Sequence, residues 1–519
     1  MAASREKLVT TAVQLVWFKR DLRTVDHAPL VQAAAAGLVL PIYLVEPEYW
    51  QQPDTSARQW QFIAQSLDEL AEELAALGGA LWLQVGDAVE TFAALLAALP
   101  IAAVWSHAET GNAFTFQRDR AIAQLLREHG IPWHELRQDG VRRGRHDRGD
   151  FAAHWAQFVA QPRQPPPAVI AFYTDLPTHL ASHSLPSAAA LCLAPDTCPH
   201  AQPGGRRRGL RLLKSFLHER AEQYLKGMSS PRTAPQHCSR LSPHLAYGTL
   251  SLREVVQATR ARQLEVASSP APYWSRALQA FASRLAWQSH FMQKLETEPA
   301  LEWQNLHPAL RTQRQTGDAA ILHAFASGQT GLPFIDACLH RLQATGWINF
   351  RMRALLAAFG CYHLWQPWTA VGQILARLFI DYEPGIHWSQ MQMQSGSTGI
   401  NAFRIYNPLK QSVDQDPEGS FIRQWIPVLR SVPTQWIHEP WRMPESLQIQ
   451  FACRIGVDYP APIIEPIAAA RTAKARLREA YATSEARAQS AMVLIKHGSR
   501  KPRRRTKQPA PAPQLSLFE

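Results

Sequence analysis

The chain contains 519 residues, and its 54 Lys and Arg outnumber its 42 Asp and Glu to give a formal net charge of +12. At about 100 to 200 residues per domain, this length predicts two or three domains. The 46% of hydrophobic residues excludes a globally disordered chain, and no apolar run approaches the ~20 residues of a membrane span. The basic excess favours a polyanionic partner, nucleic acid first, although it could also serve solubility.

The N-terminal residues and the cysteines bear on the cellular compartment. Residues 1–7 lead into no hydrophobic segment with a cleavage site, so we expect a cytoplasmic protein with no membrane partner. No C-x-x-C pair occurs, which argues against a disulfide framework and against a zinc or iron–sulfur site. We interpret the cysteines as small buried hydrophobic residues: Cys192, Cys198, Cys238, Cys338, Cys361 and Cys453.

Residues 1–140 alternate short apolar runs with helical periods, which is typical of a parallel sheet wrapped by helices. A helix is predicted between Trp60 and Leu74, where apolar residues recur at a spacing of three and four, and another is predicted to begin at Asp87. No G-x-G-x-x-G turn follows the first apolar run, which argues against a dinucleotide bound at a glycine-rich loop. Strands are predicted at 13–18, 41–45, 80–85 and 102–106.

The rest of the chain divides into three segments with different sequence patterns. Residues 141–205 are rich in Pro, Gly and Arg without periodicity, and they predict a long linker. Residues 206–470 are helical in pattern, and prolines divide them into many fairly short helices. Residues 471–519 predict an Ala/Arg-rich amphipathic helix followed by a basic tail that is disordered from about residue 497. Residues 496–519 alone carry +6 of the net charge.

Two polar clusters in the helical region suggest chemistry. In residues 238–245, hydroxyl groups and an Arg precede a helix break, which suits a phosphate group, although ordinary N-capping explains the same residues. Arg351 and Arg353 fall on different faces of one predicted helix. A buried Arg requires an acidic partner, and Asp381 is the candidate because it follows an apolar run.

Tryptophan is unusually abundant, with 17 residues in the chain. Most of these side chains must belong to the hydrophobic core. A few could instead stack on flat aromatic ligands or bases, or relay electrons.

Four segments resemble the photolyase/cryptochrome family. Residues 17–23 resemble its opening strand and turn, residues 239–245 its flavin-phosphate loop, and residues 401–408 and 418–425 its C-terminal signature. The resemblance runs from about residue 13 to 465. It implies an α/β antenna domain with a Rossmann-like parallel sheet, followed by a larger all-helical domain that holds non-covalent FAD in a bent conformation.

The resemblance also implies the residues that would bind and serve the cofactor. Arg353 and Asp381 would form an ion pair beside the isoalloxazine. His387 takes the place of the residue next to flavin N5, where it could donate a hydrogen bond or, if charged, stabilise a reduced anionic flavin. These three are the candidate catalytic residues. The implied FAD-binding residues are Tyr224, Ser239, Arg240, Leu241, Ser242, Arg353, Asp381 and Glu383.

The implied activity is repair of UV-induced pyrimidine dimers in DNA. Reduced FAD, excited by blue light, would pass an electron into a dimer flipped into the cavity. Trp287 matches the base-stacking residue of the family, and Arg351 matches a residue that contacts the lesion strand. The implied contacts to damaged DNA are Arg284, Trp287, Gln288, Phe350, Arg351 and Met393.

Several departures from the family pattern leave the lesion open. Arg284 stands where cyclobutane-dimer repair enzymes carry a Glu, Gln288 where they carry an Arg, and Phe350 where they carry an Asn. The His pair of (6-4) photolyases is also missing, because Asn349 and Phe350 occupy its place. The alternatives are therefore repair of either lesion, in duplex or single strands, a cryptochrome-type blue-light photoreceptor without repair activity, and a flavoprotein that only binds single strands.

The electron relay and the antenna also depart from the pattern. Trp368 matches the middle Trp of the relay, but Met391 stands at the flavin-proximal position. Either Trp388 or Trp365 must then serve as the flavin-proximal residue of the relay, and we expect Trp388 because it adjoins His387. Residues 106–112, Arg118 and Asp119 lie where the family places its antenna, and a folate, a flavin or no chromophore at all could lie there.

The C-terminus carries one further signal. The last residues resemble the pentapeptide by which bacterial repair proteins dock on the sliding clamp, and the Pro-rich stretch before them would act as a tether. A chance apolar end on a solvated tail is the alternative. The expected partners are thus UV-damaged DNA and a bacterial sliding clamp, bound by a monomer. The candidate motif is Gln514, Leu515, Ser516, Leu517 and Phe518.

Overall fold

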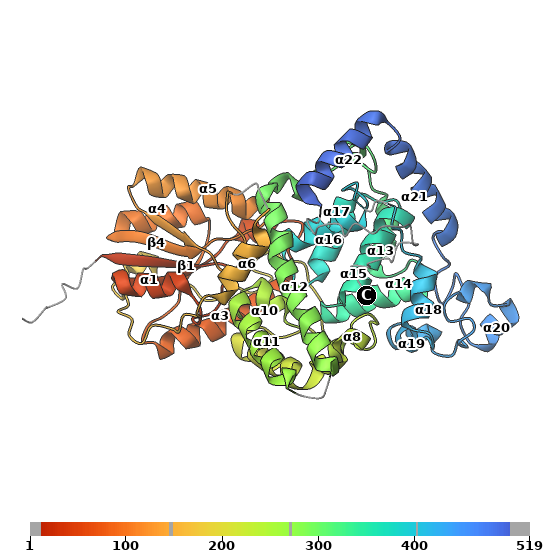
Figure 1. Ribbon diagram of the computed structural model, residues 1–519, viewed down its shortest axis with the longest axis horizontal. Coiled ribbons are helices and arrows are strands. Elements are labelled where there is room, and N and C mark those ends of the chain that lie inside the picture. Colours follow the sequence, from red (N-terminus) through yellow and green to blue (C-terminus); the bar gives the residue numbers. More distant parts are fainter. Residues whose placement is uncertain (1–11, 145–148, 269–271, 401–402, 499–519) are drawn as a thin grey trace, which may run out of the picture.

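The structure is a computed structural model, which describes residues 12–144, 149–268, 272–400 and 403–498. Figure 1 shows an α/β part formed by the first third of the chain and a larger helical part formed by the rest. The predicted clamp motif and the tail beyond residue 498 lie outside the described residues. Among the helices that the structure describes, none is long and apolar enough to cross a membrane.

The α/β part is built on a five-stranded parallel sheet with the strand order β3-β2-β1-β4-β5. The four predicted strands are present, and the first has the predicted bounds. The fifth strand was not predicted, because it has only four residues and His134 and Glu135 interrupt its apolar pattern. The strands are β1 (Val13–Phe18), β2 (Leu38–Val45), β3 (Trp82–Val85), β4 (Ile101–His107) and β5 (Trp133–Leu136).

Helices cover both faces of the sheet, which explains why its strands are nearly all apolar. Val16 and Phe18 of β1 pack with α1 and α3, whereas Leu15 and Trp17 pack with α4 and α5. Asp87 caps α4 as predicted, since its side chain accepts a hydrogen bond from the backbone of the first turn. The helices are α1 (Ala28–Ala36), α2 (Pro47–Trp50), α3 (Ala57–Ala76), α4 (Ala88–Ala98) and α5 (Ala113–Glu128).

The region predicted as an irregular linker contains a helix, α6 (Phe151–Ala160), so the prediction was wrong there. Phe151, Trp155, Phe158 and Val159 recur at helical spacing, so the signal was present in the sequence and was missed. α11 (Leu252–Ala267) packs against this helix. The residues from 161 to 205 mostly lack regular secondary structure, as expected.

The second part is helical, as predicted, and Pro333, Pro384 and Pro408 each begin a helix. The remaining α-helices are α7 (Arg206–Ser215), α8 (Tyr224–Gly227), α9 (Ala234–His237), α10 (Ser242–Ala246), α12 (Pro272–Thr297), α13 (Ala319–Ser327), α14 (Pro333–Thr345), α15 (Phe350–Ala358), α16 (Trp368–Leu378), α17 (Pro384–Gln394), α18 (Pro408–Gln415), α19 (Ser420–Trp425), α20 (Glu445–Gln450), α21 (Pro466–Ala480) and α22 (Ser484–His497). Single 3-10 or π turns are η1 (Thr178–Leu180), η2 (Phe216–Arg220), η3 (Ala221–Gln223), η4 (Pro299–Glu302), η5 (Pro308–Leu310), η6 (Phe359–His363), η7 (Pro427–Leu429) and η8 (Pro440–Arg442).

The cysteines only partly match their interpretation as buried residues. Cys338, Cys361 and Cys453 are buried, but Cys192 is exposed, so the interpretation was wrong for that residue. All six are free thiols, which agrees with the absence of a disulfide framework.

The turn after β1 is held by one buried carboxylate. Asp21 Oδ1 accepts a hydrogen bond from the Lys19 backbone at 2.7 Å, and Asp21 Oδ2 accepts from His27 Nε2 at 2.9 Å and His107 Nδ1 at 2.8 Å. Burial alone would raise the pKa of Asp21, but its attraction to His27 and these hydrogen bonds hold it well below its usual range. Burial lowers the pKa of His107 to about 3, so its ring is neutral at pH 7. The carboxylate therefore fixes the ends of β1 and β4 relative to each other.

We predict that Asp21→Ala lowers the free energy of unfolding by about 3 kcal/mol or more, because it leaves three buried donors without an acceptor. Urea denaturation measures this change. Asp87→Ala is the matched control, because it removes an exposed helix cap worth about 1 kcal/mol. Equal losses in the two variants would show that the Asp21 network does not stabilise the fold in this way.

Candidate functional site

One large cavity, of about 350 Å³, lies in the helical part among α8, α10, α12, α15 and α17. Its walls are mostly apolar, with a few polar side chains converging on it, as is usual for a ligand site. Met393 does not line it, and Trp368 and Trp388 lie buried in the neighbouring core. The predicted site residues that line the cavity are Tyr224, Ser239, Arg240, Leu241, Ser242, Arg284, Trp287, Gln288, Phe350, Arg351, Arg353, Asp381, Glu383 and His387.

Arg240 places a positive charge in the cavity wall without a matching carboxylate. Its backbone has a φ of 61°, in the left-handed region, and its guanidinium stacks on Trp347 with Cζ 4.3 Å from the ring centroid. Burial and the nearby Arg341 lower its pKa to about 10. Of the described residues, no Asp or Glu lies within 4.0 Å of its guanidinium. A buried cation of this kind is stabilised by an anion, so this end of the cavity suits a phosphate.

The predicted ion pair between Arg353 and Asp381 is present. Arg353 Nη1 donates to Asp381 Oδ1 at 3.0 Å and Nη2 to Oδ2 at 2.8 Å, a bidentate geometry. Arg353 Nε also donates to the Ile348 carbonyl, and the guanidinium lies 4.1 Å from the Phe379 ring centroid. Because α15 supplies the Arg and the residues after α16 supply the Asp, the pair ties two walls of the cavity together. Its place beside a flavin stays a prediction.

His387, on α17, is held neutral. Burial lowers its pKa to about 3, and its Nε2 lies 2.9 Å from the Gly372 carbonyl. A carbonyl oxygen can only accept, so Nε2 carries the proton and Nδ1 is left as an acceptor. The structure therefore disfavours the idea that a charged His387 stabilises an anionic flavin.

All the residues predicted to contact DNA except Met393 line the same cavity. Phe350 is 39% exposed there. The Arg284 guanidinium lies over Trp287, with Cζ 4.1 Å from the ring centroid. Arg284 thus occupies a face of the ring on which a base could stack, so a base can use that face only if Arg284 moves.

Trp368 and Trp388 form an aromatic pair behind the cavity. Their ring centroids are 5.8 Å apart at an angle of 76°, and Trp388 lies 4.8 Å from the His387 ring. Trp365 is in a different setting. The guanidiniums of Arg314 and Arg476 lie 5.0 and 4.9 Å from its ring centroid.

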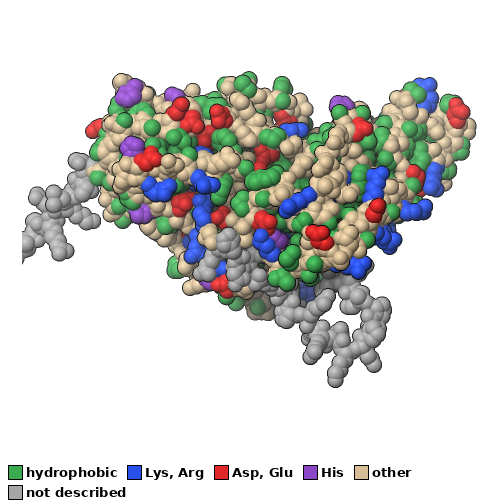
Figure 2. Space-filling model, turned by 90° about the horizontal axis from the view of Figure 1, so that it is seen from above, with side chains coloured by type: hydrophobic (Ala, Val, Ile, Leu, Met, Phe, Trp, Pro, Cys, Tyr) green, Lys and Arg blue, Asp and Glu red, His purple; other side chains and the backbone are tan. Residues whose placement is uncertain are grey.

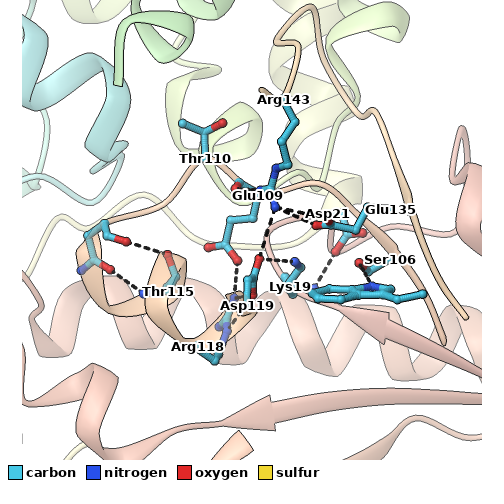
Figure 3. Close-up of polar contacts among 12 residues, drawn as sticks. Lys19, Asp21, Ser106, Glu109, Thr110, Thr115, Arg118, Asp119, Glu135 and Arg143 are labelled. Atoms are coloured by element: carbon cyan, nitrogen blue, oxygen red, sulfur yellow. Dashed lines mark hydrogen bonds and ion pairs between the residues drawn. The ribbon is translucent and has the colours of Figure 1, made fainter. Parts of the chain in front are cut away.

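The residues predicted at the antenna position are bonded to one another. Figure 3 shows them at the carboxyl ends of β1 and β4. Lys19 Nζ lies 3.1 Å from Asp119, and the Arg118 guanidinium contacts Glu46 and Glu109 at 2.7 Å and Asp119 at 2.8 Å. This network fills the edge of the sheet where α/β proteins commonly bind a ligand.

The cavity suits a large ligand with an apolar part and an anionic part, and FAD has both. Among the described wall residues, the buried polar atoms without a hydrogen-bond partner include Arg240 Nε, Gln288 Oε1, Asn349 Oδ1 and Glu383 Oε1. Sequence reasoning missed Asn349 and Trp347 as wall residues. Their position just before Arg351, in an aromatic segment between two helices, was the only signal.

Comparison with known proteins agrees with this site. Residues 14–143 match the family model for DNA photolyase, and residues 281–479 match the model for the FAD binding domain of DNA photolyase. The fold and these matches therefore define a protein with a five-stranded parallel α/β domain and a helical FAD-binding domain. The chain belongs to the photolyase/cryptochrome family.

Relatives of both functional types are similar to this chain. It is 30% identical to deoxyribodipyrimidine photo-lyase from Vibrio cholerae over 479 residues, which cover 85% of this chain and 96% of that protein. It is 27% identical to cryptochrome-2 from Arabidopsis thaliana over 516 residues, 93% of this chain and 80% of the other. A class III photolyase structure from Agrobacterium tumefaciens aligns with a TM-score of 0.79 and 25% identity, covering 93% of this chain and all of that one.

We predict that Arg240→Ala weakens FAD binding by about 10- to 100-fold, the loss expected for a hydrogen bond to a charged group. Fluorescence titration of the apoprotein with FAD measures the affinity. Arg211→Ala is the control. Arg211 is an exposed residue of α7 outside the cavity, so this variant leaves the affinity unchanged. If the two variants bind FAD equally well, Arg240 is not the anion-binding group.

Proposed function

We propose that this protein is a blue-light-driven, FAD-dependent enzyme that repairs UV-induced pyrimidine dimers in DNA. The supporting observation is a single cavity that combines an unpaired buried cation, Arg240, with a half-exposed aromatic opening at Trp287 and Phe350. The first feature suits a cofactor diphosphate, and the second suits a flipped base.

Different residues of the cavity hold different parts of the cofactor. Arg240 and the hydroxyls of Ser239 and Ser242 bind the diphosphate, and the Arg353 and Asp381 pair orients the ring system. His387 keeps its proton on Nε2 and offers Nδ1 as an acceptor. The apolar walls exclude water from the reacting groups. When bound and reduced, FAD supplies the electron that excitation makes available for splitting the dimer.

The DNA contacts would come from the rim and the surrounding surface. Arg351 positions a phosphate, and Trp287 and Phe350 offer faces on which bases stack. Figure 2 shows Lys and Arg side chains gathered on the helical part, toward the end where α21 and α22 lie. On α21 the exposed basic residues are Arg471, Lys474, Arg476 and Arg478. Such a surface attracts a phosphate backbone without reading its sequence.

The alternative is a cryptochrome-type photoreceptor without repair activity. The observation that favours it is Arg284, which covers Trp287 and replaces the acid expected of a cyclobutane-dimer enzyme. The clamp-docking motif at residues 514–518 favours repair, because a photoreceptor has no evident use for a replication clamp. Clamp docking and an antenna chromophore, whether folate, flavin or none, stay predictions.

We predict that the reduced FAD-loaded protein splits cyclobutane dimers or (6-4) lesions under blue light and leaves both intact in the dark. Chromatography of duplex and single-stranded substrates measures the products. Trp287→Ala is expected to weaken substrate binding, because base stacking on an aromatic side chain contributes about 1 to 3 kcal/mol. Repair of neither lesion in either substrate would contradict the proposed enzyme and favour the photoreceptor.

We predict that Trp388→Phe slows photoreduction of bound FAD by an external thiol at least about ten-fold, because the variant removes the ring that connects the cavity to Trp368. Trp365→Phe is the matched control and leaves the rate unchanged. The two guanidiniums beside Trp365 oppose a positive charge on its ring. Transient absorption of the bound flavin gives both rates, and equal rates in Trp388→Phe and the wild type would exclude this route.

A further inference from the structure

Three cavities, each sharing wall residues with the next, form a line along the junction of the two parts, from the large cavity toward the surface. A second cavity, of about 20 Å³, shares Gln288 and Glu383 with the large one. A third, of about 10 Å³, shares Thr110, Gln138 and Asp139 with the second. Spaces of this size and polarity hold single water molecules. The line ends beside Arg137 and Arg143, which are exposed and one-third exposed.

Glu383 stands where the line begins. Its side chain is 6% exposed, its Oε2 lies 3.4 Å from Arg20 Nη2, and its Oε1 has no partner. The other groups that act on it are Asp139, Glu109 and the Gly385 backbone N–H. Burial outweighs the attraction to Arg20 and raises the pKa of Glu383 to about 7. This carboxyl group therefore exchanges a proton near neutral pH.

Asp139 is the middle carboxyl and lines both small cavities. Its Oδ1 accepts a hydrogen bond from the Val141 backbone at 2.7 Å, and the charged groups that act on it are Glu296, Arg23 and Arg137. Burial raises its pKa to about 6 despite that hydrogen bond. A second group that titrates near neutrality thus lies next along the line.

Glu296, from α12, is the outer carboxyl. It accepts a hydrogen bond from Thr110 Oγ1 at 2.9 Å and lies 3.7 Å from Arg143 Nε. Glu135 and the Gly144 backbone also act on it, and burial raises its pKa in spite of Arg143. Figure 3 shows Thr110, Arg143 and Glu135 around this end of the line.

We propose that Glu296, Asp139 and Glu383 form a proton relay that connects the FAD cavity with solvent, an inference that rests on the proposed function. Glu383 would supply its carboxyl proton to the FAD ring system when an external donor reduces the bound cofactor with electrons alone. Its carboxylate is then reprotonated by Asp139 through an intervening water, Asp139 by Glu296, and Glu296 by solvent. One proton enters the relay from solvent for each proton that leaves it, so each carboxyl group ends in the protonation state in which it began. His387 cannot take this role, because its Nε2 proton is held by the Gly372 carbonyl.

The relay is tested by proton uptake in the FAD-loaded protein. The protein is reduced in weakly buffered solution with the methyl viologen radical cation, which gives up an electron without a proton, and a pH-indicator dye follows uptake while flavin absorbance follows reduction. Asp139→Asn and Glu296→Gln are expected to slow proton uptake about 100-fold, the low end of the loss for removing an acid–base group. FAD content is unchanged in both variants, because neither residue lines the large cavity. Asp139→Glu keeps a carboxyl group and restores uptake.

Glu302→Gln is the matched control. Burial also raises the pKa of Glu302 to about 7, but its side chain accepts a hydrogen bond from the Ala113 backbone and does not line the cavities of the relay. Uptake in this variant equals that of the wild type. In the wild type, uptake slows as the pH rises through 6 to 7, because the carboxyl groups of Asp139 and Glu383 lose their protons as the pH passes their raised pKa values.

Equal uptake in Asp139→Asn, Glu296→Gln and the wild type would overturn the relay while leaving the proposed function intact. Failure of the wild type to bind FAD would instead contradict the proposed function, and the relay with it. Slow uptake in Glu302→Gln as well would also overturn the relay, because it would show that any buried carboxyl in this region has the same effect.

Discussion

Arg20 joins the two parts of the molecule, and the site depends on that contact. Its guanidinium leaves the turn after β1, donates to the carbonyls of Ala246 at 3.0 Å and Tyr382 at 2.7 Å, and lies 3.4 Å from Glu383. These partners are in or beside the walls of the large cavity. Asp21, the next residue, fixes the turn itself through its bonds to two imidazoles. A rigid turn in the α/β domain therefore sets the position of a wall in the helical domain.

The electrostatics of the cavity follow from this close junction. Arg240 is buried without a carboxylate, whereas Glu383 lies 3.4 Å from Arg20 and has its pKa raised to about 7 by burial, so the cavity walls offer a group for an anion and a group that exchanges a proton. Arg353 and Asp381 balance each other's charge in a bidentate pair, which offsets part of the desolvation cost of burying them. An apolar cavity with these three kinds of polar group can bind a large flavin cofactor and exchange a proton with it.

Sequence patterns predicted elements where a local signal exists. Val13–Phe18 is a continuous apolar run bounded by polar residues, and the strand has those bounds. Strand β5 was missed because His134 and Glu135 interrupt its four residues, and helix α6 was missed although Phe151, Trp155, Phe158 and Val159 recur at helical spacing. The candidate site spans residues 224 to 387. The charge of a buried Arg suggested Asp381 as its partner, but only the resemblance to a known family brought the other residues together. The stacking of Arg284 on Trp287 and the line of small cavities depend on side-chain conformations that no local pattern specifies.

A crystal structure of the FAD-loaded protein would test the central claim most directly. The account predicts FAD in the large helical cavity, with its diphosphate within hydrogen-bond distance of the Arg240 guanidinium and its ring system against the Arg353 and Asp381 pair. FAD bound elsewhere, for example at the carboxyl edge of the five-stranded sheet, or a diphosphate placed away from Arg240, would contradict it.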